Sequence, residues 1–322
     1  MKILDQVIEK DYSIYNADTV EVARGLPDES VDFSIFSPPF ASLYTYSNSD
    51  RDMGNVKSDE EFWTQYKFLI AEQFRVMKPG RNIAIHCMNL PTSKVNDGHI
   101  GLKDFRGDII RAYQDAGFIY HSEVCIWKNP VTAMTRTKAL GLLHKTVKKD
   151  AAMSRQGIPD YVVVMRKPGE NPKPVAGEFQ YYVGETPPHG FTVHERNDGS
   201  TFCKPSENNT SIDVWQKYAS PIWDDIRETD TLNFREGRDS DDERHICPLQ
   251  LDVIERCLQL WSLPSDVVWT PFMGIGSEVY MSIKLGRKAI GAELKPSYFN
   301  LAKRNIESAY KSQYDMFCEE AA

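Results

Sequence analysis

The sequence of 322 residues has few cysteines, and no two of its six cysteines form a CxxC pair. The spacings of its histidines and cysteines also match no zinc-binding module, so we expect neither disulfides nor a metal site. No apolar run approaches the length of about 20 residues that a membrane-spanning helix needs, and the first residues lack the apolar core of a signal peptide. These absences predict a cytoplasmic protein that contacts no membrane.

The chain also has no excess of positive charge. Its formal net charge is −8 at pH 7. A negative total argues weakly against a nucleic-acid partner, but a local patch rather than the total decides contact with phosphates. Such a patch lies between Trp127 and Lys167, where nine basic and two acidic residues give a local charge of +7. This segment predicts either a phosphate-binding surface or an ordinary solvated helix face.

The sequence does contain a clear alternation of strand-like and helix-like patterns. Alternating apolar residues and short apolar runs predict strands over residues 30–37, 81–90, 119–128, 160–167, 266–272 and 287–294. Apolar residues at helical spacing predict helices over residues 58–80, 105–118, 247–262 and 296–310. Such alternation predicts an α/β fold with a Rossmann-like, mostly parallel sheet and helices on both faces.

This alternation is interrupted between Pro168 and about Asp242. The stretch is rich in Gly, Pro, Asn and Glu and shows no period, which predicts an irregular insertion or a small separate lobe. We therefore divide the chain into residues 1–167, an inserted region over residues 168–243, and residues 244–322.

The predicted strand over residues 30–37 runs into the sequence Ser37-Pro38-Pro39-Phe40. Two adjacent prolines cannot continue a strand, because each lacks an N–H donor and the residue before a proline is held in an extended conformation. The chain therefore forms a rigid corner in which carbonyl acceptors lie beside an aromatic ring. Such a corner is suited to hold a flat group that carries hydrogen-bond donors.

A second feature is a strand, a glycine turn, a helix and another strand over residues 266–294. Gly274 and Gly276 allow the backbone to approach a ligand, and Ser277 is predicted to cap the helix, whose N-terminus favours an anionic group. Glu293 ends the second strand, where a carboxylate can accept hydrogen bonds from a ribose. The turn lacks both the third glycine of a dinucleotide fingerprint and a phosphate-binding lysine, so we predict another nucleoside-containing cofactor.

Together these motifs resemble the DNA amino-methyltransferases, which methylate cytosine N4 or adenine N6. The resemblance rests on FSPPF, on HICPLQL, and on PFMGIGS with AIGAEL, in the β-type order that places the catalytic motif before the cofactor motif. It covers most of the chain and implies a methyltransferase fold that uses S-adenosylmethionine. It further implies that residues 1–167 form the catalytic half, residues 168–243 the target-recognition region and residues 244–322 the cofactor-binding half.

The resemblance implies a site-specific enzyme that methylates the exocyclic amine of a base flipped out of DNA. The catalytic motif is then Ser37, Pro38, Pro39 and Phe40, in which Ser37 and the Pro38 carbonyl accept the N–H bonds and Phe40 stacks on the base. No general base need act first, because the amine becomes acidic only after methyl transfer. Serine in place of Asp or Asn favours cytosine N4 over adenine N6, which stays the alternative.

The resemblance also assigns residues to cofactor and DNA. The cofactor-binding residues it implies are Asp18, His245, Pro248, Phe272, Gly274, Gly276, Ser277 and Glu293. For the basic segment we predict contact with the DNA backbone through Lys128, Arg136, Lys138, Lys145, Lys148, Lys149 and Arg155. The expected partner is therefore DNA, and the sequence leaves a homodimer open.

Thr270 departs from the family, which commonly has Asp at this position. The missing carboxylate predicts weaker cofactor binding and supports an alternative in which the chain is a DNA-binding relative that has lost catalysis. A further alternative is methylation of a protein glutamine. Ser37 argues against it, because the motif there is usually Asn-Pro-Pro-Tyr. No nuclease motif is present, so we expect a stand-alone methylase rather than a fused restriction–modification protein.

Overall fold

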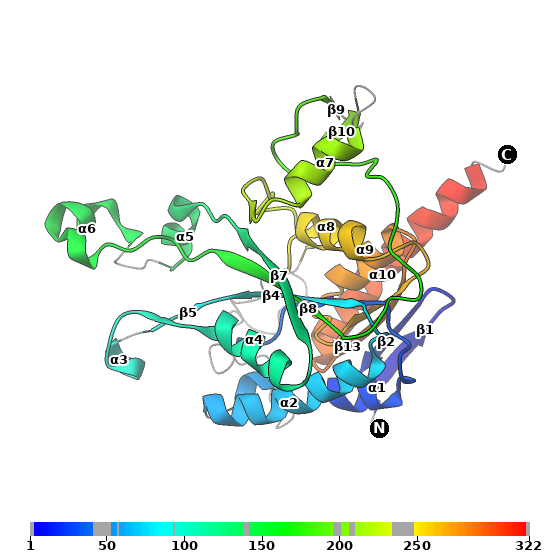
Figure 1. The fold of residues 1–322 in the computed structure, drawn as a ribbon, viewed down its shortest axis with the longest axis horizontal. Coiled ribbons are helices and arrows are strands. Elements are labelled where there is room, and N and C mark those ends of the chain that lie inside the picture. The colour runs from blue at the N-terminus through cyan, green and yellow to red at the C-terminus, as the bar shows by residue number, and fades with distance from the viewer. Residues whose placement is uncertain are drawn as a thin grey trace.

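A nine-stranded sheet forms the centre of the computed structural model (Figure 1). The structure describes residues 3–40, 53–56, 58–92, 94–137, 142–195, 201–205, 210–233 and 248–319. In spatial order the strands are β1 (Asp5–Ile8), β2 (Tyr12–Asn16), β13 (Lys288–Glu293), β12 (Val267–Thr270), β3 (Phe33–Phe36), β4 (Asn82–Met88), β8 (Asp160–Arg166), β7 (Ile119–Ile126) and β11 (Ile222–Trp223).

Most neighbouring strands of this sheet are parallel, which confirms the predicted mostly parallel α/β fold. The exceptions are β1 against β2 and the pairings of β8 with β4 and with β7. Because β8 runs against both of its neighbours, its first residue lies beside the last residues of β4 and β7. Asp160 is paired in register with Met88 and with Ile126.

Helices cover both faces of the sheet, as predicted (Figure 1). The side chains of β4 alternate between the two faces. Ile83 and Ile85 belong to the core under one set of helices, and Ala84 belongs to the core under the other. The first face carries α1 (Thr19–Gly25), α2 (Asp59–Val76) and α4 (Phe105–Asp115). The second carries α8 (Leu251–Trp261) and α9 (Ser277–Lys284), and α10 (Pro296–Glu319) packs with α9 over β2 and β13.

Two segments project beyond the sheet on the side where β4 ends (Figure 1). One joins β7 to β8 and contains α5 (Pro130–Thr137), α6 (His144–Lys149) and the 3-10 helix η4 (Ala151–Met153). The other follows β4 and contains β5 (Leu90–Pro91), α3 (Lys94–Asp97) and β6 (Leu102–Lys103). The short η2 (Met53–Asn55) precedes α2.

The inserted region is more regular than its sequence predicts. It contains a hairpin of β9 (Phe191–Glu195) and β10 (Thr201–Pro205), the helix α7 (Thr210–Tyr218), and β11, which joins the central sheet beside β7. Arg256 of α8 anchors this region, because its buried guanidinium forms an ion pair of 2.9 Å with Asp225 and lies over the rings of Tyr182, Tyr218 and Trp223. The region therefore packs on the sheet and on α8.

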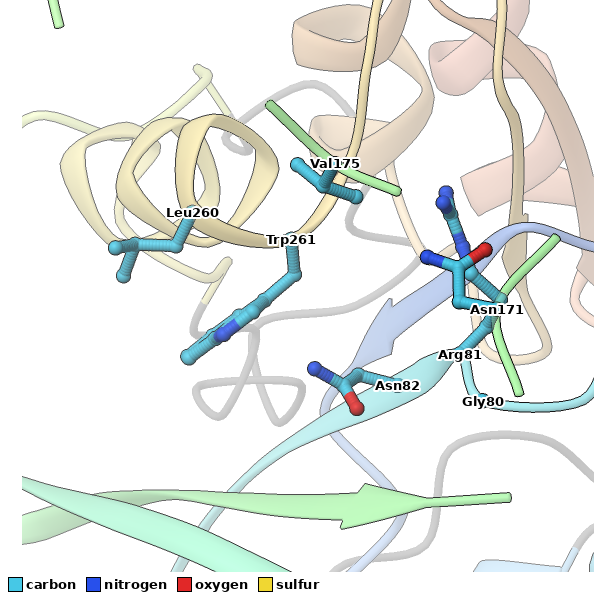
Figure 2. Close-up of a pocket in the computed structure, with 7 residues that line it drawn as sticks. All are labelled: Gly80, Arg81, Asn82, Asn171, Val175, Leu260 and Trp261. Carbon is cyan, nitrogen blue, oxygen red and sulfur yellow. The ribbon is translucent and has the colours of Figure 1, made fainter. Parts of the chain in front are cut away.

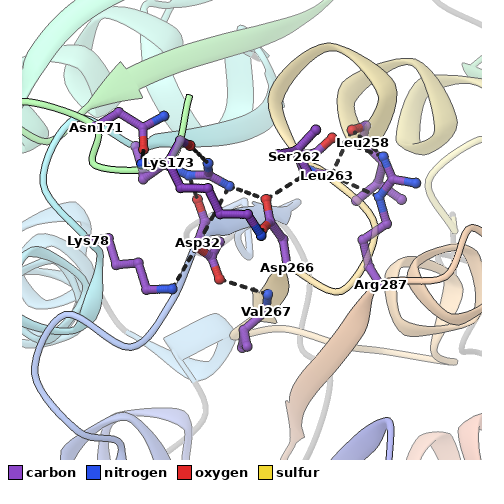
Figure 3. A network of polar contacts seen from close by, with 11 residues as sticks. Asp32, Lys78, Asn171, Lys173, Leu258, Ser262, Leu263, Asp266, Val267 and Arg287 are labelled. Carbon is purple, nitrogen blue, oxygen red and sulfur yellow. Dashed lines mark hydrogen bonds and ion pairs between the residues drawn. The ribbon is translucent and has the colours of Figure 1, made fainter. Parts of the chain in front are cut away.

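A polar network holds the strands together at the end of the sheet where β3, β4 and β12 begin, which we call the amino end (Figure 3). Arg81 is buried, forms an ion pair with Asp266, and donates from Nε to the carbonyl of Asp32 at 2.7 Å. The carboxylate of Asp32 accepts from the Val267 N–H at 3.0 Å and pairs with Lys78 at 2.7 Å. These contacts join residues that are far apart in sequence.

Two absences apply to the described part of the chain. None of its helices combines the length and the hydropathy that a membrane crossing requires. The same residues contain no cluster of three or more metal-ligating side chains.

Candidate active site

The candidate site lies where β3, β4, β7, β12 and β13 end, which we call the carboxyl end of the sheet. In open α/β sheets ligands bind in the crevice outside the carboxyl ends of the strands. Ser37 directly follows β3, His86 is near the end of β4, and Lys128 follows β7. Asp160 joins them because the antiparallel β8 begins at this end.

These four side chains form a continuous chain of polar contacts. The hydroxyl of Ser37 lies 2.8 Å from Nδ1 of His86, and Nε2 of His86 lies 3.0 Å from Oδ2 of Asp160. The ammonium of Lys128 lies 2.7 Å from the same carboxylate oxygen. His86 pairs in register with Val162, two residues after Asp160, so His86 and Asp160 project from the same face of the sheet.

The carboxylate of Asp160 is held in its ionised form. Burial alone would favour the protonated acid, but the hydrogen bond and charge of His86, together with the charge of Lys128, lower the pKa of Asp160 below its ordinary value. At neutral pH this carboxylate is therefore negative. Because it carries no proton, it can only accept hydrogen bonds.

The proline corner is packed against the core beside this chain of contacts. Pro38 is buried and Phe40 is half-buried, with its ring 6.0 Å from that of Phe105 in an edge-on arrangement. Phe36, the residue before Ser37, contacts Phe272 at a ring distance of 5.8 Å. The predicted catalytic motif and the predicted cofactor turn are therefore neighbours in space.

Glu293 is fixed by the backbone at the end of β13. Its Oε2 accepts from the N–H of Gly274 at 2.9 Å, and its Oε1 accepts from the N–H of Lys295 at 2.7 Å. Asn16 holds the same turn, because its side-chain amide donates to the carbonyls of Glu293 and Leu294 at 2.8 and 3.0 Å. The carboxylate therefore has a defined position beside the glycine turn.

The two glycines of the turn have different surroundings. Both have positive φ, +53° at Gly274 and +89° at Gly276. A Cβ at Gly274 would meet nothing within 4 Å, whereas a Cβ at Gly276 would lie 3.1 Å from side-chain atoms of Ala302 and Ile306. Gly274 thus faces open space, and Gly276 allows α10 to pack closely.

The prediction that Ser277 caps α9 is wrong. The cap residue is Gly276, in the left-handed region and without a side-chain hydrogen bond, and Ser277 is the first, buried residue of the helix. The reason is the backbone, since the turn needs a positive φ just before the helix and glycine adopts it at little cost. The adjacent Glu278 is buried, and burial raises its pKa to about 8.

Asp18 lies at the end of β2, next to the end of β13. Its carboxylate caps α1 by accepting from the N–H of Glu21 at 3.0 Å. It also lines a pocket of about 290 Å³ together with Met53, Gln65 and Phe68. A helix cap and a ligand contact are both compatible with this position.

The remaining cofactor predictions fall in different surroundings. Pro248 is half-buried in the segment that leads into α8, while His245 lies outside the described residues. Thr270 is buried at the end of β12, and its hydroxyl has no hydrogen-bond partner within the described chain. Glu278 does not replace the carboxylate that Thr270 lacks, because its raised pKa keeps it mostly protonated at neutral pH.

The predicted DNA-binding residues separate into two groups. Lys145, Lys148 and Lys149 are exposed on α6, a helix without buried residues, and Arg155 follows it, half-buried. Lys128 instead points into the candidate site and pairs with Asp160. Of the other two predicted residues, Arg136 belongs to α5 and Lys138 lies outside the described residues.

Sequence reasoning missed His86, Asp160 and Asn16. Two of them have a weak signal, because His86 interrupts an apolar strand and Asp160 precedes another. The contact between His86 and Asp160 depends on β8 running antiparallel between β4 and β7, and no local pattern encodes that pairing.

The family model of the N6/N4 DNA methylases matches residues 31–304. Among relatives, the type II methyltransferase M.BglII of Bacillus subtilis is 26% identical over 293 residues, which is 90% of this chain and 67% of that protein. M.BglI of Bacillus subtilis is 23% identical, over 94% of this chain and 88% of that protein.

Solved structures share the fold. The DNA modification methylase TTHA0409 of Thermus thermophilus, in complex with S-adenosyl-L-methionine, superposes with a TM-score of 0.58 at 22% identity and covers 91% of this chain and 94% of its own. The cytosine-N4-specific PvuII DNA methyltransferase superposes with a TM-score of 0.60 at 14% identity, over 96% and 95%. At these identities the likeness concerns the fold.

Proposed function

Because the chain belongs to the N6/N4 DNA methylase family, whose model spans residues 31–304, we propose that it methylates the N4 amine of a cytosine in DNA. Family membership itself confirms the resemblance, the methyltransferase fold and the activity of a DNA methyltransferase that uses S-adenosylmethionine. The target base and the roles of individual residues are the proposal.

The observation that carries the proposal is the contact of 2.8 Å between His86 and the hydroxyl of Ser37, the first residue of the proline corner. A nucleobase amine is a poor nucleophile because its lone pair is delocalised into the ring, so acceptors must draw its N–H bonds away from the ring plane. The Ser37 hydroxyl and the Pro38 carbonyl supply such acceptors, and Phe40 offers a ring for stacking. Serine at this position favours cytosine, and the PvuII enzyme of similar fold is cytosine-N4-specific.

The turn after β12 fits the methyl donor. S-adenosylmethionine supplies an electrophilic methyl group on a sulfonium. Glu293 would accept hydrogen bonds from the ribose hydroxyls, because the N–H groups of Gly274 and Lys295 hold its carboxylate in a defined position. Gly274 leaves space for the ligand, and the hydroxyl of Thr270, which has no hydrogen-bond partner among the described residues, is buried at the end of β12. Asp18, Phe272 and Pro248 would complete the surroundings.

DNA would lie across the carboxyl end of the sheet, beside the segment that contains α5 and α6. Lys145, Lys148 and Lys149 are exposed there, and no ion pair within the described residues neutralises them. Residues 168–243 are proposed as the target-recognition region, because this stretch adds β11 beside β7, the strand that leads into the basic segment. We propose a stand-alone methylase, and a homodimer stays a prediction.

Sequencing of DNA from cells that express the protein tests the proposed function. We expect 4-methylcytosine at one short recognition sequence, and no such base in cells that express Ser37→Ala. Methyl groups at adenine N6 in the same experiment would overturn the choice of base.

A second readout separates the alternatives. An inactive DNA-binding relative would leave DNA unmethylated and would bind no labelled S-adenosylmethionine. A protein methylase would transfer the labelled methyl group to protein instead of DNA.

A further inference from the structure

We propose that His86 is a positioning residue that makes the Ser37 hydroxyl a hydrogen-bond acceptor for the target amine and then takes up the proton that the amine loses. The inference rests on the methyl transfer proposed above. It is carried by the contacts of His86, which joins Ser37 at 2.8 Å to Asp160 at 3.0 Å.

The contact with Asp160 sets the tautomer of His86. The ionised carboxylate of Asp160 can only accept, so Nε2 of the imidazole must carry the proton of that contact. In the neutral ring, Nδ1 then has a lone pair, and it can only accept from the hydroxyl of Ser37. With its proton directed to His86, the Ser37 oxygen offers its lone pairs to the substrate.

This arrangement selects the chemical class of the substrate group. An amine presents N–H donors to the Ser37 oxygen and the Pro38 carbonyl. A base carbonyl would present a third acceptor to two acceptors, which leaves all of them unpaired. The site therefore favours exocyclic amines over the keto groups of thymine and guanine.

The contact between Ser37 and His86 also gives the proton of the methylated amine a path to the imidazole. The amine nitrogen uses its lone pair to form the N–C bond, while the C–S bond breaks and its electron pair stays on sulfur. The nitrogen becomes cationic and passes a proton to Oγ of Ser37, as the serine proton moves to Nδ1 of His86. Asp160 stabilises the resulting imidazolium, which later releases the proton to solvent. The products are a neutral methylamine and a neutral thioether.

The environment of His86 is consistent with this role. Asp160 comes from β8, Lys128 follows β7, and Ser37 follows β3, so three strands around β4 contribute the groups that face the imidazole directly or through Asp160. Lys128 lies 2.7 Å from the same carboxylate and balances its charge. Proton uptake by His86 follows methyl transfer, because the amine becomes acidic only when it has been methylated.

A second histidine provides a matched control. Nδ1 of His121 also lies 2.9 Å from a serine hydroxyl, that of Ser122, but the pair is exposed and no carboxylate contacts the ring within the described residues. It belongs to the part of β7 near the amino end of the sheet. His121→Gln thus removes a similar contact without touching the site.

The test compares His86→Gln, Asp160→Asn and His121→Gln with the wild type. Single-turnover methylation of duplex DNA at saturating S-adenosylmethionine is measured across pH, together with cofactor affinity. We expect the wild-type rate to fall at low pH, because a protonated His86 donates to Ser37 and turns the serine proton toward the amine. His86→Gln should be roughly 10²-fold slower without this low-pH decline, because glutamine accepts a hydrogen bond but no proton.

Asp160→Asn should slow the reaction at least as much, because an amide can donate to Nε2 and favours the opposite tautomer. Cofactor affinity of both variants should stay within about twofold, which also shows that they are folded, and His121→Gln should match the wild type. A His86→Gln enzyme at the wild-type rate, or with the wild-type pH profile, would overturn the proposal.

A readout independent of activity separates this inference from the proposed function. Nitrogen-15 NMR of labelled histidine should show the Nε2–H tautomer for His86 in the wild type and its loss in Asp160→Asn. An unchanged tautomer in Asp160→Asn overturns the positioning role. A wild type that binds the cofactor and transfers no methyl group to DNA would instead overturn the proposed function, and the NMR result would still decide whether Asp160 sets the tautomer.

Discussion

The two ends of the central sheet use the same kinds of polar side chain for different purposes. At the amino end, buried Asp32 pairs with Lys78 and buried Asp266 pairs with Arg81 (Figure 3). Their charges are therefore neutralised within the protein. At the carboxyl end, Ser37 contacts His86 beside the proline corner, and Glu293 contacts the glycine turn. One end holds the strands in place, and the other is left with groups that can act on a ligand.

The amino end also contains a cavity that could be mistaken for the site. It measures about 150 Å³ and is lined by residues of the β4 start, by Asn171 and Val175, and by Leu260 and Trp261 (Figure 2). Its place at the beginning of β4 puts it at the opposite end of that strand from His86. Since α/β sheets bind ligands at the carboxyl ends of their strands, we assign this cavity no part in the reaction.

The largest effect is expected from Arg81→Met at the amino end of the sheet. Removing Arg81 leaves the buried carboxylate of Asp266 without its buried partner and should lower the free energy of unfolding by about 3–5 kcal/mol. Urea denaturation measures this loss. The methylation rate per folded molecule should not change, because Arg81 lies at the far end of the sheet.

Lys173→Met is the matched control for Arg81. The Lys173 ammonium lies 3.6 Å from Asp266, but its side chain is 63% exposed. Exposed pairs contribute about 0–1 kcal/mol, so this variant should be close to the wild type. Equal stability losses in both variants would contradict the assignment of a structural role to the buried pair alone.

A smaller effect should separate the two glycines of the cofactor turn. Gly274→Asn places its side chain in open space, and asparagine tolerates positive φ, so the fold should lose less than about 1 kcal/mol. Cofactor affinity should nevertheless fall at least about tenfold, because the side chain occupies the space proposed for the ligand.

Gly276→Ala should behave in the opposite way. Its Cβ would press on Ala302 and Ile306 at 3.1 Å, and such overpacking costs about 1–3 kcal/mol. Calorimetry and denaturation of both variants measure the two quantities. If Gly274→Asn binds the cofactor like the wild type, the ligand does not approach the turn at this point.

The sequence was informative wherever a short pattern determines a local structure. Ser58 caps α2 through the N–H of Glu61 at 3.2 Å, three residues on, as its spacing predicts. The strand that leads to Ser37 and the strand that ends at Glu293 also lie where alternation places them. These elements depend on residues that are close together in the sequence, so a local sequence pattern is enough to predict them.

Features that depend on the pairing of distant strands could not be predicted in this way. Lys128 was assigned to DNA from local charge, but the antiparallel β8 brings Asp160 to it. The same strand creates the contact between Asp160 and His86. The inserted region looked irregular because β11 spans only Ile222–Trp223 and is stabilised by its pairing with β7.

The smallest effect is expected from the exposed lysines of α6, which we propose contact the DNA backbone. If Lys148 and Lys149 contact phosphates, their binding releases counterions, and affinity for DNA falls steeply with salt. The double variant Lys148→Ala, Lys149→Ala should lower the slope of log affinity against log salt by about two, without changing the preferred sequence.

The double variant Lys10→Ala, Lys288→Ala is the matched control, because both lysines are exposed at the amino end of the sheet. Fluorescence anisotropy with specific and unrelated duplexes gives both slopes. A slope that changes equally in the two double variants would mean that α6 is an ordinary solvated helix and that the backbone of DNA is held elsewhere, with the inserted region as the next candidate.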